Sequence, residues 1–177
     1  MSKHCADINQ DRDKGALWER NFCQILAENG RVFTPLQIGR ESSAQCFFKE
    51  LGVWHHSTLP DITVWTAPGE YHEIKHKNTT KFGTFGLEQY RFEALKWFAN
   101  ETGQKVFYTI HNHGLSGGSN SNINHIDHWI TADILDLDEK WTIRCYGDSW
   151  INGVKKKTPI YYWHKNLWRP LREIIKL

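Results

Sequence analysis

Two neighbouring segments, Pro60-Asp61-Ile62-Thr63-Val64-Trp65 and Glu70-Tyr71-His72-Glu73-Ile74-Lys75, decide the fold predicted for this chain. Both are rich in the β-branched and aromatic residues that favour strands. Between them, Ala67-Pro68-Gly69 has the composition of a turn. The sequence therefore predicts an antiparallel hairpin over residues 61–77.

The predicted hairpin brings two carboxylates and an amine to one point. Side chains alternate faces along a strand, so Glu73 and Lys75 share a face, and Asp61 on the neighbouring strand can reach the same spot. Asp61, Glu73 and the backbone carbonyl of Ile74 offer the hard oxygen ligands that Mg²⁺ prefers. Lys75 is placed to orient or deprotonate an attacking water, or to stabilise the transition state, and the sequence leaves these roles open. Such short patterns also occur without any catalytic role.

The segments around the hairpin predict alternating helices and strands. We expect a loose polar arm over 1–14, a connecting loop over 81–85 and a mobile loop over 115–124. Helices are predicted over 15–29, 41–51 and 86–102, the first ending at Gly30 and the last at Gly103, with strands over 32–38 and 106–110. This order favours an α/β fold with a central mixed sheet flanked by helices.

The length of 177 residues predicts a single domain, 1–177, with its core in 15–110. Beyond the core, 126–177 is expected to be a β-rich extension with short strands such as 141–146 and 160–163.

Residues 15–110 resemble the PD-(D/E)XK nuclease superfamily, which includes type II restriction endonucleases and archaeal Holliday-junction resolvases. Asp61, Glu73 and Lys75 match its defining motif, and the order of predicted elements is that of the family. The resemblance implies a restriction-endonuclease-like central mixed β-sheet flanked by helices. It also implies a DNA endonuclease that uses Mg²⁺, with Mn²⁺ as a substitute, in restriction, repair, recombination or phage DNA processing.

The same resemblance suggests two further site residues. Many members add an acid from the first core helix, which makes Glu19 a candidate catalytic residue and metal ligand. The helix after the hairpin commonly contributes a glutamine, and Gln89 fits that place. Its neighbours Glu88 and Tyr90 stay open, because the helix register is not fixed by the sequence.

Basic residues outside the motif predict contacts with DNA phosphates. The candidates are two lysines beside the motif and three near the C-terminus: Lys77, Lys81, Lys155, Lys156 and Lys157. The net charge of +2 is too small to argue for a polyanionic partner by itself, and a solvated basic surface is the competing interpretation. Whether two copies pair as a homodimer to cut both strands is left open.

Other sites and functions compete with the nuclease hypothesis. His111, His113, His125 and His128 lie close in sequence and would suit zinc, although histidines near a loop are more often surface residues. A non-catalytic nucleic-acid-binding module with the same fold is the main alternative, and the nine tryptophans would also suit a protein-interaction domain. No phosphate-binding loop, dinucleotide fingerprint or nucleophile elbow is present.

The cysteines and the N-terminus predict a cytoplasmic protein. Four cysteines are scattered without a close pair, which fits reduced thiols. The first residues lack an apolar leader, and no stretch has the length and hydrophobicity expected of a membrane span.

Overall fold

The computed structural model describes residues 7–35, 45–50, 53–58, 60–65, 69–112, 125–151 and 154–175. The α-helices are α1 (Asp7–Glu28), α2 (Gln89–Thr102), α3 (Ile134–Leu137) and α4 (Leu171–Ile174), with 3-10 helices η3 (Ile126–His128) and η4 (Lys165–Leu167). The strands are β1 (Phe33–Pro35), β2 (Gln45–Glu50), β3 (Val53–Thr58), β4 (Ile62–Val64), β5 (Glu70–Lys77), β6 (Thr84–Glu88), β7 (Lys105–Asn112), β8 (Trp129–Asp133), β9 (Ile143–Ile151), β10 (Val154–His164) and β11 (Arg169–Pro170).

The described strands form one large sheet and two small ones. The large sheet has the order β1-β4-β5-β7-β8-β11, and its β5–β7 pair is parallel while the other pairs are antiparallel. The predicted central mixed sheet is therefore present. The order β6-β10-β9 makes a second sheet, and β2 pairs with β3 in a third.

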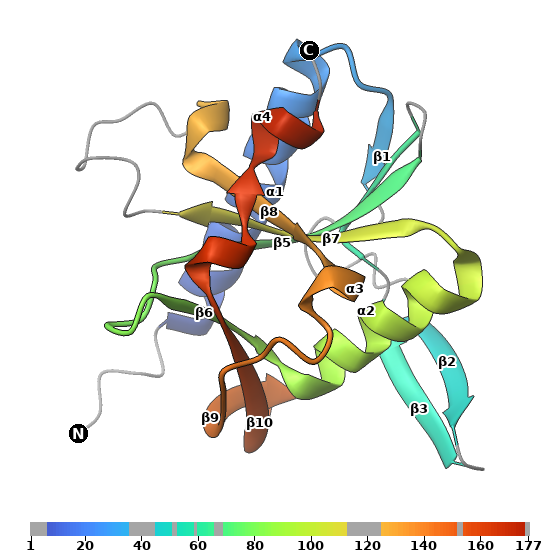
Figure 1. Ribbon diagram of the computed structural model, residues 1–177, viewed down its shortest axis with the longest axis vertical. Coiled ribbons are helices and arrows are strands. Elements are labelled where there is room, and N and C mark those ends of the chain that lie inside the picture. The colour runs from blue at the N-terminus through green and yellow to red at the C-terminus, as the bar shows by residue number, and fades with distance from the viewer. Residues whose placement is uncertain are drawn as a thin grey trace.

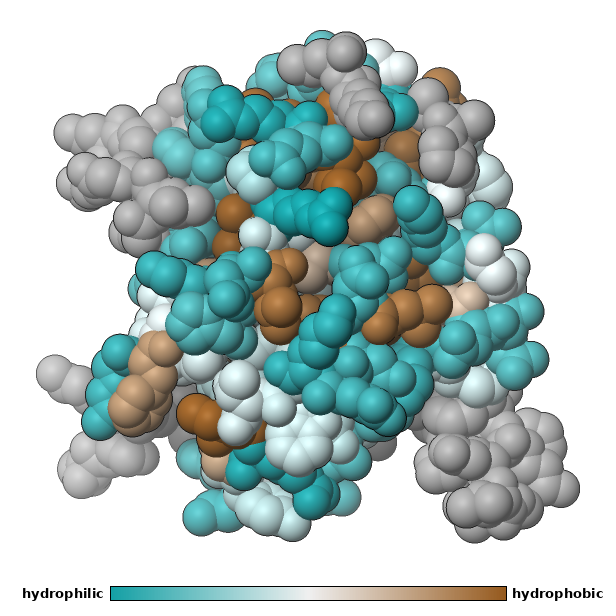
Figure 2. Space-filling view, in the orientation of Figure 1, coloured by the Kyte–Doolittle hydropathy of each residue, from teal (hydrophilic) through white to brown (hydrophobic). Residues whose placement is uncertain are grey.

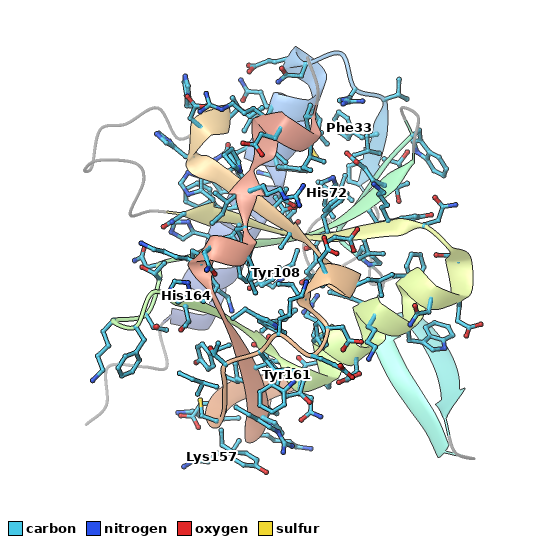
Figure 3. All side chains as sticks on the ribbon, in the orientation of Figure 1. Phe33, His72, Tyr108, Lys157, Tyr161 and His164 are labelled. Carbon is cyan, nitrogen blue, oxygen red and sulfur yellow. The ribbon has the colours of Figure 1, made fainter. Side chains whose placement is uncertain are left out.

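Two hydrophobic cores lie on opposite sides of the large sheet. Figure 1 shows α2, α3 and the β9–β10 hairpin below the central strands and α4 above them. Phe22, Ile25 and Leu26 of α1 pack with Ile74 of β5 in one core, and Phe92 and Leu95 of α2 belong to the other core. Figure 3 shows the same division within the central strands, since His72 and Tyr108 point to opposite sides.

Successive side chains of β5 face opposite sides of the sheet, so the motif residues and the core residues of this strand lie on different sides. Ile74 faces the α1 core, as does His72, whose ring lies 5.0 Å from the ring of Phe22. Glu73 and Lys75 face the opposite side, toward α2. His72 and His76 thus point away from the acidic motif, and His76 stacks on Trp18 of α1.

Several predicted elements are confirmed. The hairpin of β4 and β5 is antiparallel, and β7 contains the predicted strand 106–110. The predicted ends of two helices, at Gly30 and at Gly103, are also confirmed. Both glycines have the left-handed backbone that ends a helix, with φ of 66° and 64°.

Other predicted elements are wrong. Residues 45–50 form strand β2 rather than part of a helix over 41–51, because Gln45–Glu50 pairs along its whole length with β3. The arm predicted over 1–14 is helical from Asp7, because extending an existing helix adds hydrogen bonds without the cost of nucleating a new one. Positions 41–44 and the predicted loop 115–124 lie outside the described residues.

Pairing with the C-terminal strands explains the remaining differences. Residues 84–88, predicted as loop and helix, are strand β6, because each of them pairs with a residue of β10. The helix therefore starts at Gln89 instead of Gly86. Strands β9 and β10 have 9 and 11 residues, and are longer than the short strands expected in this region.

No helix in the described ranges is long and apolar enough to cross a membrane.

Candidate active site

The hairpin of β4 and β5 brings the predicted motif residues together. Asp61 stands directly before β4 and is buried, with 4% of its surface exposed. The backbone N–H of Ile74 on β5 donates a hydrogen bond to Asp61 Oδ2, at 2.7 Å. Strand β5 thus fixes the Asp61 carboxylate beside Glu73, the residue that precedes Ile74.

The Lys75 ammonium lies among the three predicted oxygen ligands. Its Nζ donates to the carbonyl oxygen of Ile74 at 3.1 Å and lies 3.9 Å from Asp61 Oδ2. It also forms a close ion pair with Glu73 Oε1. The three motif side chains and the Ile74 carbonyl therefore converge on one point, where a positive charge is already accommodated.

Arg91 of α2 also reaches this point, and the sequence analysis missed it. Its Nε lies 2.6 Å from Glu73 Oε1, and the Glu73 side chain is fully buried. The one signal in the sequence was a cation in the first turn of the helix, where the helix dipole disfavours positive charge. That signal was hidden, because the helix was expected to begin three residues earlier.

Burial and the neighbouring charges shift the pKa values of the two carboxyl groups in opposite directions. Burial, followed by the negative charge of Glu73, raises the pKa of Asp61 from 3.8 to about 6. Burial alone would also raise the pKa of Glu73, but the charges of Arg91 and Lys75 outweigh it, and the pKa of Glu73 is lowered. For Lys75, burial and Arg91 act to lower the pKa, but Glu73 and Asp61 raise it overall.

The oxygen atoms at this point fit a divalent cation. Glu73 Oε2 is buried, and no hydrogen-bond partner for it occurs among the described residues. Such an atom is costly to bury unless something binds it. Asp61, Glu73 and the Ile74 carbonyl supply the hard oxygens that Mg²⁺ or Mn²⁺ prefers. We conclude that these residues suit a Mg²⁺ ion.

Glu19 lies half-buried on α1. After burial itself, its negative charge is the main factor that raises the pKa of the Cys23 thiol, to about 11. Within the ranges that the structure covers, no group of three or more His, Cys, Asp or Glu side chains is arranged to hold a metal ion. The structure therefore does not join Glu19 to Asp61 and Glu73 as a third carboxylate, and its role stays a prediction.

Gln89 opens α2, and its side chain bonds to the β9–β10 hairpin. Its Oε1 accepts a hydrogen bond from the Arg144 guanidinium on β9, at 3.0 Å. Tyr90, which follows it, is partly exposed, and burial of its hydroxyl raises the pKa of this side chain. The charges of Arg91, Lys75 and Glu73 also act on the Tyr90 hydroxyl.

The lysines predicted to bind DNA have different surroundings. The ammonium of Lys77 donates to the carbonyl oxygen of Gly86, and burial lowers its pKa. Lys81 is exposed and lies over the Phe82 ring, at 4.9 Å from the centroid. The other three are exposed on β10: Lys155, Lys156 and Lys157. Figure 3 shows Lys157 at the lower end of the molecule, on the β9–β10 hairpin.

The competing zinc site has little support from the described residues. His111 is buried, and its ring stacks on Trp18 with centroids 4.2 Å apart. The rings of His125 and His128 lie near each other, but no metal-binding group of three forms among the described side chains. His113 lies outside the described residues.

The fold is similar to that of a known nuclease. No protein-family model and no curated protein sequence matches the chain. Among solved structures, the fold is similar to that of Hjc, a Holliday junction resolvase from the archaeal hyperthermophile Archaeoglobus fulgidus. The TM-score is 0.52 and the sequence identity 13%, over 89% of this chain and 97% of the resolvase chain. This likeness confirms the fold that the PD-(D/E)XK resemblance predicted, a mixed sheet flanked by helices.

Proposed function

We propose that this chain is a Mg²⁺-dependent deoxyribonuclease that hydrolyses phosphodiester bonds within DNA. The observation that carries the proposal is the convergence of Asp61, Glu73 and Lys75 on one point, with the Ile74 carbonyl beside them. The similarity in fold to a Holliday junction resolvase supports it. We propose that residues 1–177 act as one nuclease-like domain.

The proposed chemistry assigns a separate task to each residue. Asp61, Glu73 and the Ile74 carbonyl would hold Mg²⁺, which when bound supplies charge neutralisation and lowers the pKa of a bound water. Lys75 acts as a charged hydrogen-bond donor to the attacking water or to a phosphate oxygen, because its ammonium already donates to the Ile74 carbonyl and pairs with Glu73. Arg91 keeps Glu73 ionised and fixed in place.

Cleavage of labelled duplex and branched DNA with Mg²⁺ or Mn²⁺ tests the proposal. The wild-type protein should cut at least one of these forms, and Lys75→Ala should reduce the rate by about 100-fold or more. Lys140→Ala, which removes an exposed lysine beyond α3, is the matched control and should cut like the wild type. Equal cleavage by Lys75→Ala and the wild type would refute this mechanism.

One observation favours a second candidate, a DNA-binding module without catalysis. The Lys75 ammonium takes up the position between the two carboxylates, and the described side chains supply no third acid. Calorimetric titration with Mn²⁺ separates the two candidates. The enzyme requires a binding signal that Glu73→Ala abolishes, whereas the module binds DNA in a salt-dependent way and gives no such signal.

A further inference from the structure

One face of the β9–β10 hairpin carries exposed aromatic rings beside positive charges. Directly paired residues of an antiparallel sheet lie on the same face. The register pairs Arg144 with Tyr161, Tyr146 with Pro159 and Asp148 with Lys157. We call this surface, made of Arg144, Tyr146, Asp148, Lys155 and Lys157 together with Trp141, the hairpin face.

The aromatic residues of the hairpin face are open to solvent. Tyr146 is 66% exposed and Trp141 43% exposed. The Trp141 ring stacks on Tyr161, with centroids 5.2 Å apart and an interplanar angle of 15°. Tyr161 is itself buried and belongs to the hydrophobic core around α2. One side of the Trp141 ring is thus fixed by the core.

The charges of the hairpin face favour a polyanion. Three cations, Arg144, Lys155 and Lys157, stand against one carboxylate, Asp148, which forms an ion pair with Lys155 at 2.9 Å. Figure 2 shows pale residues of intermediate hydropathy beside hydrophilic ones at the lower end of the molecule, where Figure 1 shows this hairpin. Exposed rings between cations are how proteins bind bases by stacking and the backbone by charge.

The hairpin face is tied to the helix that carries Arg91. The hydrogen bond from Arg144 to Gln89 ties the hairpin to the first residue of α2. Two residues later, Arg91 contacts Glu73. Tyr90 lies between them in the chain, is partly exposed, and is influenced by the charges of the motif. The first turn of α2 therefore joins the hairpin face to the candidate active site.

We propose that the hairpin face binds the unpaired bases of a single-stranded segment that flanks the scissile phosphate. Bases in an intact duplex are stacked on each other, so they do not offer their flat faces to Tyr146, whereas an unpaired base does. The substrate class would then be DNA with a single-stranded region beside the cut, such as a tail, flap or open junction. This inference rests on the proposed function for the position of the cut.

The experiment compares a fluorescein-labelled blunt duplex with the same duplex carrying an oligo-dT tail, by anisotropy in EDTA. The tail should strengthen binding by the wild-type protein. Tyr146→Ala should weaken binding of the tailed DNA by about 5- to 150-fold, the loss expected for one stacked base, and leave the blunt duplex unchanged. Tyr146→Phe keeps the ring and the preference. Trp65→Ala, which removes an exposed ring beside the edge strand β1 of the large sheet, is the matched control.

Any one of three results would refute the inference. If the tail adds no affinity, or if Tyr146→Ala weakens both DNAs equally or neither, the hairpin face does not bind unpaired bases. Lys157→Gln provides a second variant, and it should reduce the salt dependence of binding to the tailed DNA but not to the blunt duplex. A preference for the tail without any cleavage in Mg²⁺ would refute the proposed nuclease and keep the binding surface. Cleavage in Mg²⁺ without a preference for the tail would refute the binding surface and keep the proposed nuclease.

Discussion

Replacing Asp61 with asparagine should make the protein more stable and inactive. Burial and the charge of Glu73 raise the pKa of Asp61 from 3.8 to about 6. Between these two pH values the folded chain keeps the proton that the unfolded chain has lost. The free energy of unfolding therefore falls as the pH rises through this window, by about 3 kcal/mol in total. Above about pH 6, the ionised carboxylate opposes folding by that amount.

The Asp61→Asn variant removes the charge and keeps the size of the side chain. Its amide oxygen can still accept the hydrogen bond that the Ile74 N–H donates to Asp61. We expect the variant to be more stable than the wild type by about 2 to 3 kcal/mol near pH 7, and by much less near pH 4. Urea unfolding in EDTA, followed by tryptophan fluorescence across this pH range, measures the difference.

A control and a metal titration test the cause. Glu101→Gln removes an exposed carboxylate from α2 and should not gain stability toward neutral pH. Added Mn²⁺ should stabilise the wild type more than Asp61→Asn, because the ion binds only the folded site and needs the charged carboxylate. The reasoning is refuted if Asp61→Asn is no more stable than the wild type near neutral pH. It is also refuted if both proteins lose stability equally as the pH rises.

Three further substitutions probe the site and its support. Lys75→Met should reduce cleavage by about 100-fold or more while calorimetric Mn²⁺ binding persists, because every oxygen ligand remains. Arg91→Ala leaves the buried Glu73 with one cationic partner instead of two, and urea unfolding should show a loss of about 1 to 3 kcal/mol. Gly86→Ala puts a Cβ atom 2.6 Å from the Tyr162 ring, so thermal unfolding should show a loss of about 1 to 3 kcal/mol. Combining it with Tyr162→Ala should cost less than the sum of the two single changes.

Elements specified by nearby residues could be predicted from the sequence. The hairpin of β4 and β5 has strand-forming residues on both sides of a turn sequence, and its antiparallel pairing follows from that arrangement. The ends of α1 and α2 follow from Gly30 and Gly103, because glycine adopts the left-handed conformation without steric cost. In each case the signal lies within a few residues of the feature.

Elements that depend on distant partners could not be predicted. Residues 84–88 become strand β6 only because β10, more than seventy positions later, provides its hydrogen-bonding partner. Gln45–Glu50 is likewise a strand because it pairs with β3, although its sequence also fits a helix. Local preferences are weak compared with the energy of pairing and burial, so the final fold overrides them.

The same distinction separates the motif from Arg91. Asp61, Glu73 and Lys75 were identifiable because a hairpin and strand alternation fix their relative positions to within one residue. A helix turns by about 100° per residue, so an error of three residues in its start leaves the facing side chain undetermined. Pairing of β6 with β10 sets the start of α2 at Gln89 and thereby directs Arg91 to Glu73.

Arg91 also explains why two neighbouring carboxylates behave differently. Both Asp61 and Glu73 are buried, and burial alone would raise the pKa of each. Arg91 and Lys75 both contact Glu73 closely, whereas the nearest cation to Asp61 Oδ2 is Lys75, at 3.9 Å. Glu73 is therefore charged before any metal binds, and Asp61 is the carboxylate that gains most from a nearby divalent cation. In the proposed site, Glu73 would therefore meet a metal ion already ionised, and the cation would relieve the cost of ionising the buried Asp61 carboxylate.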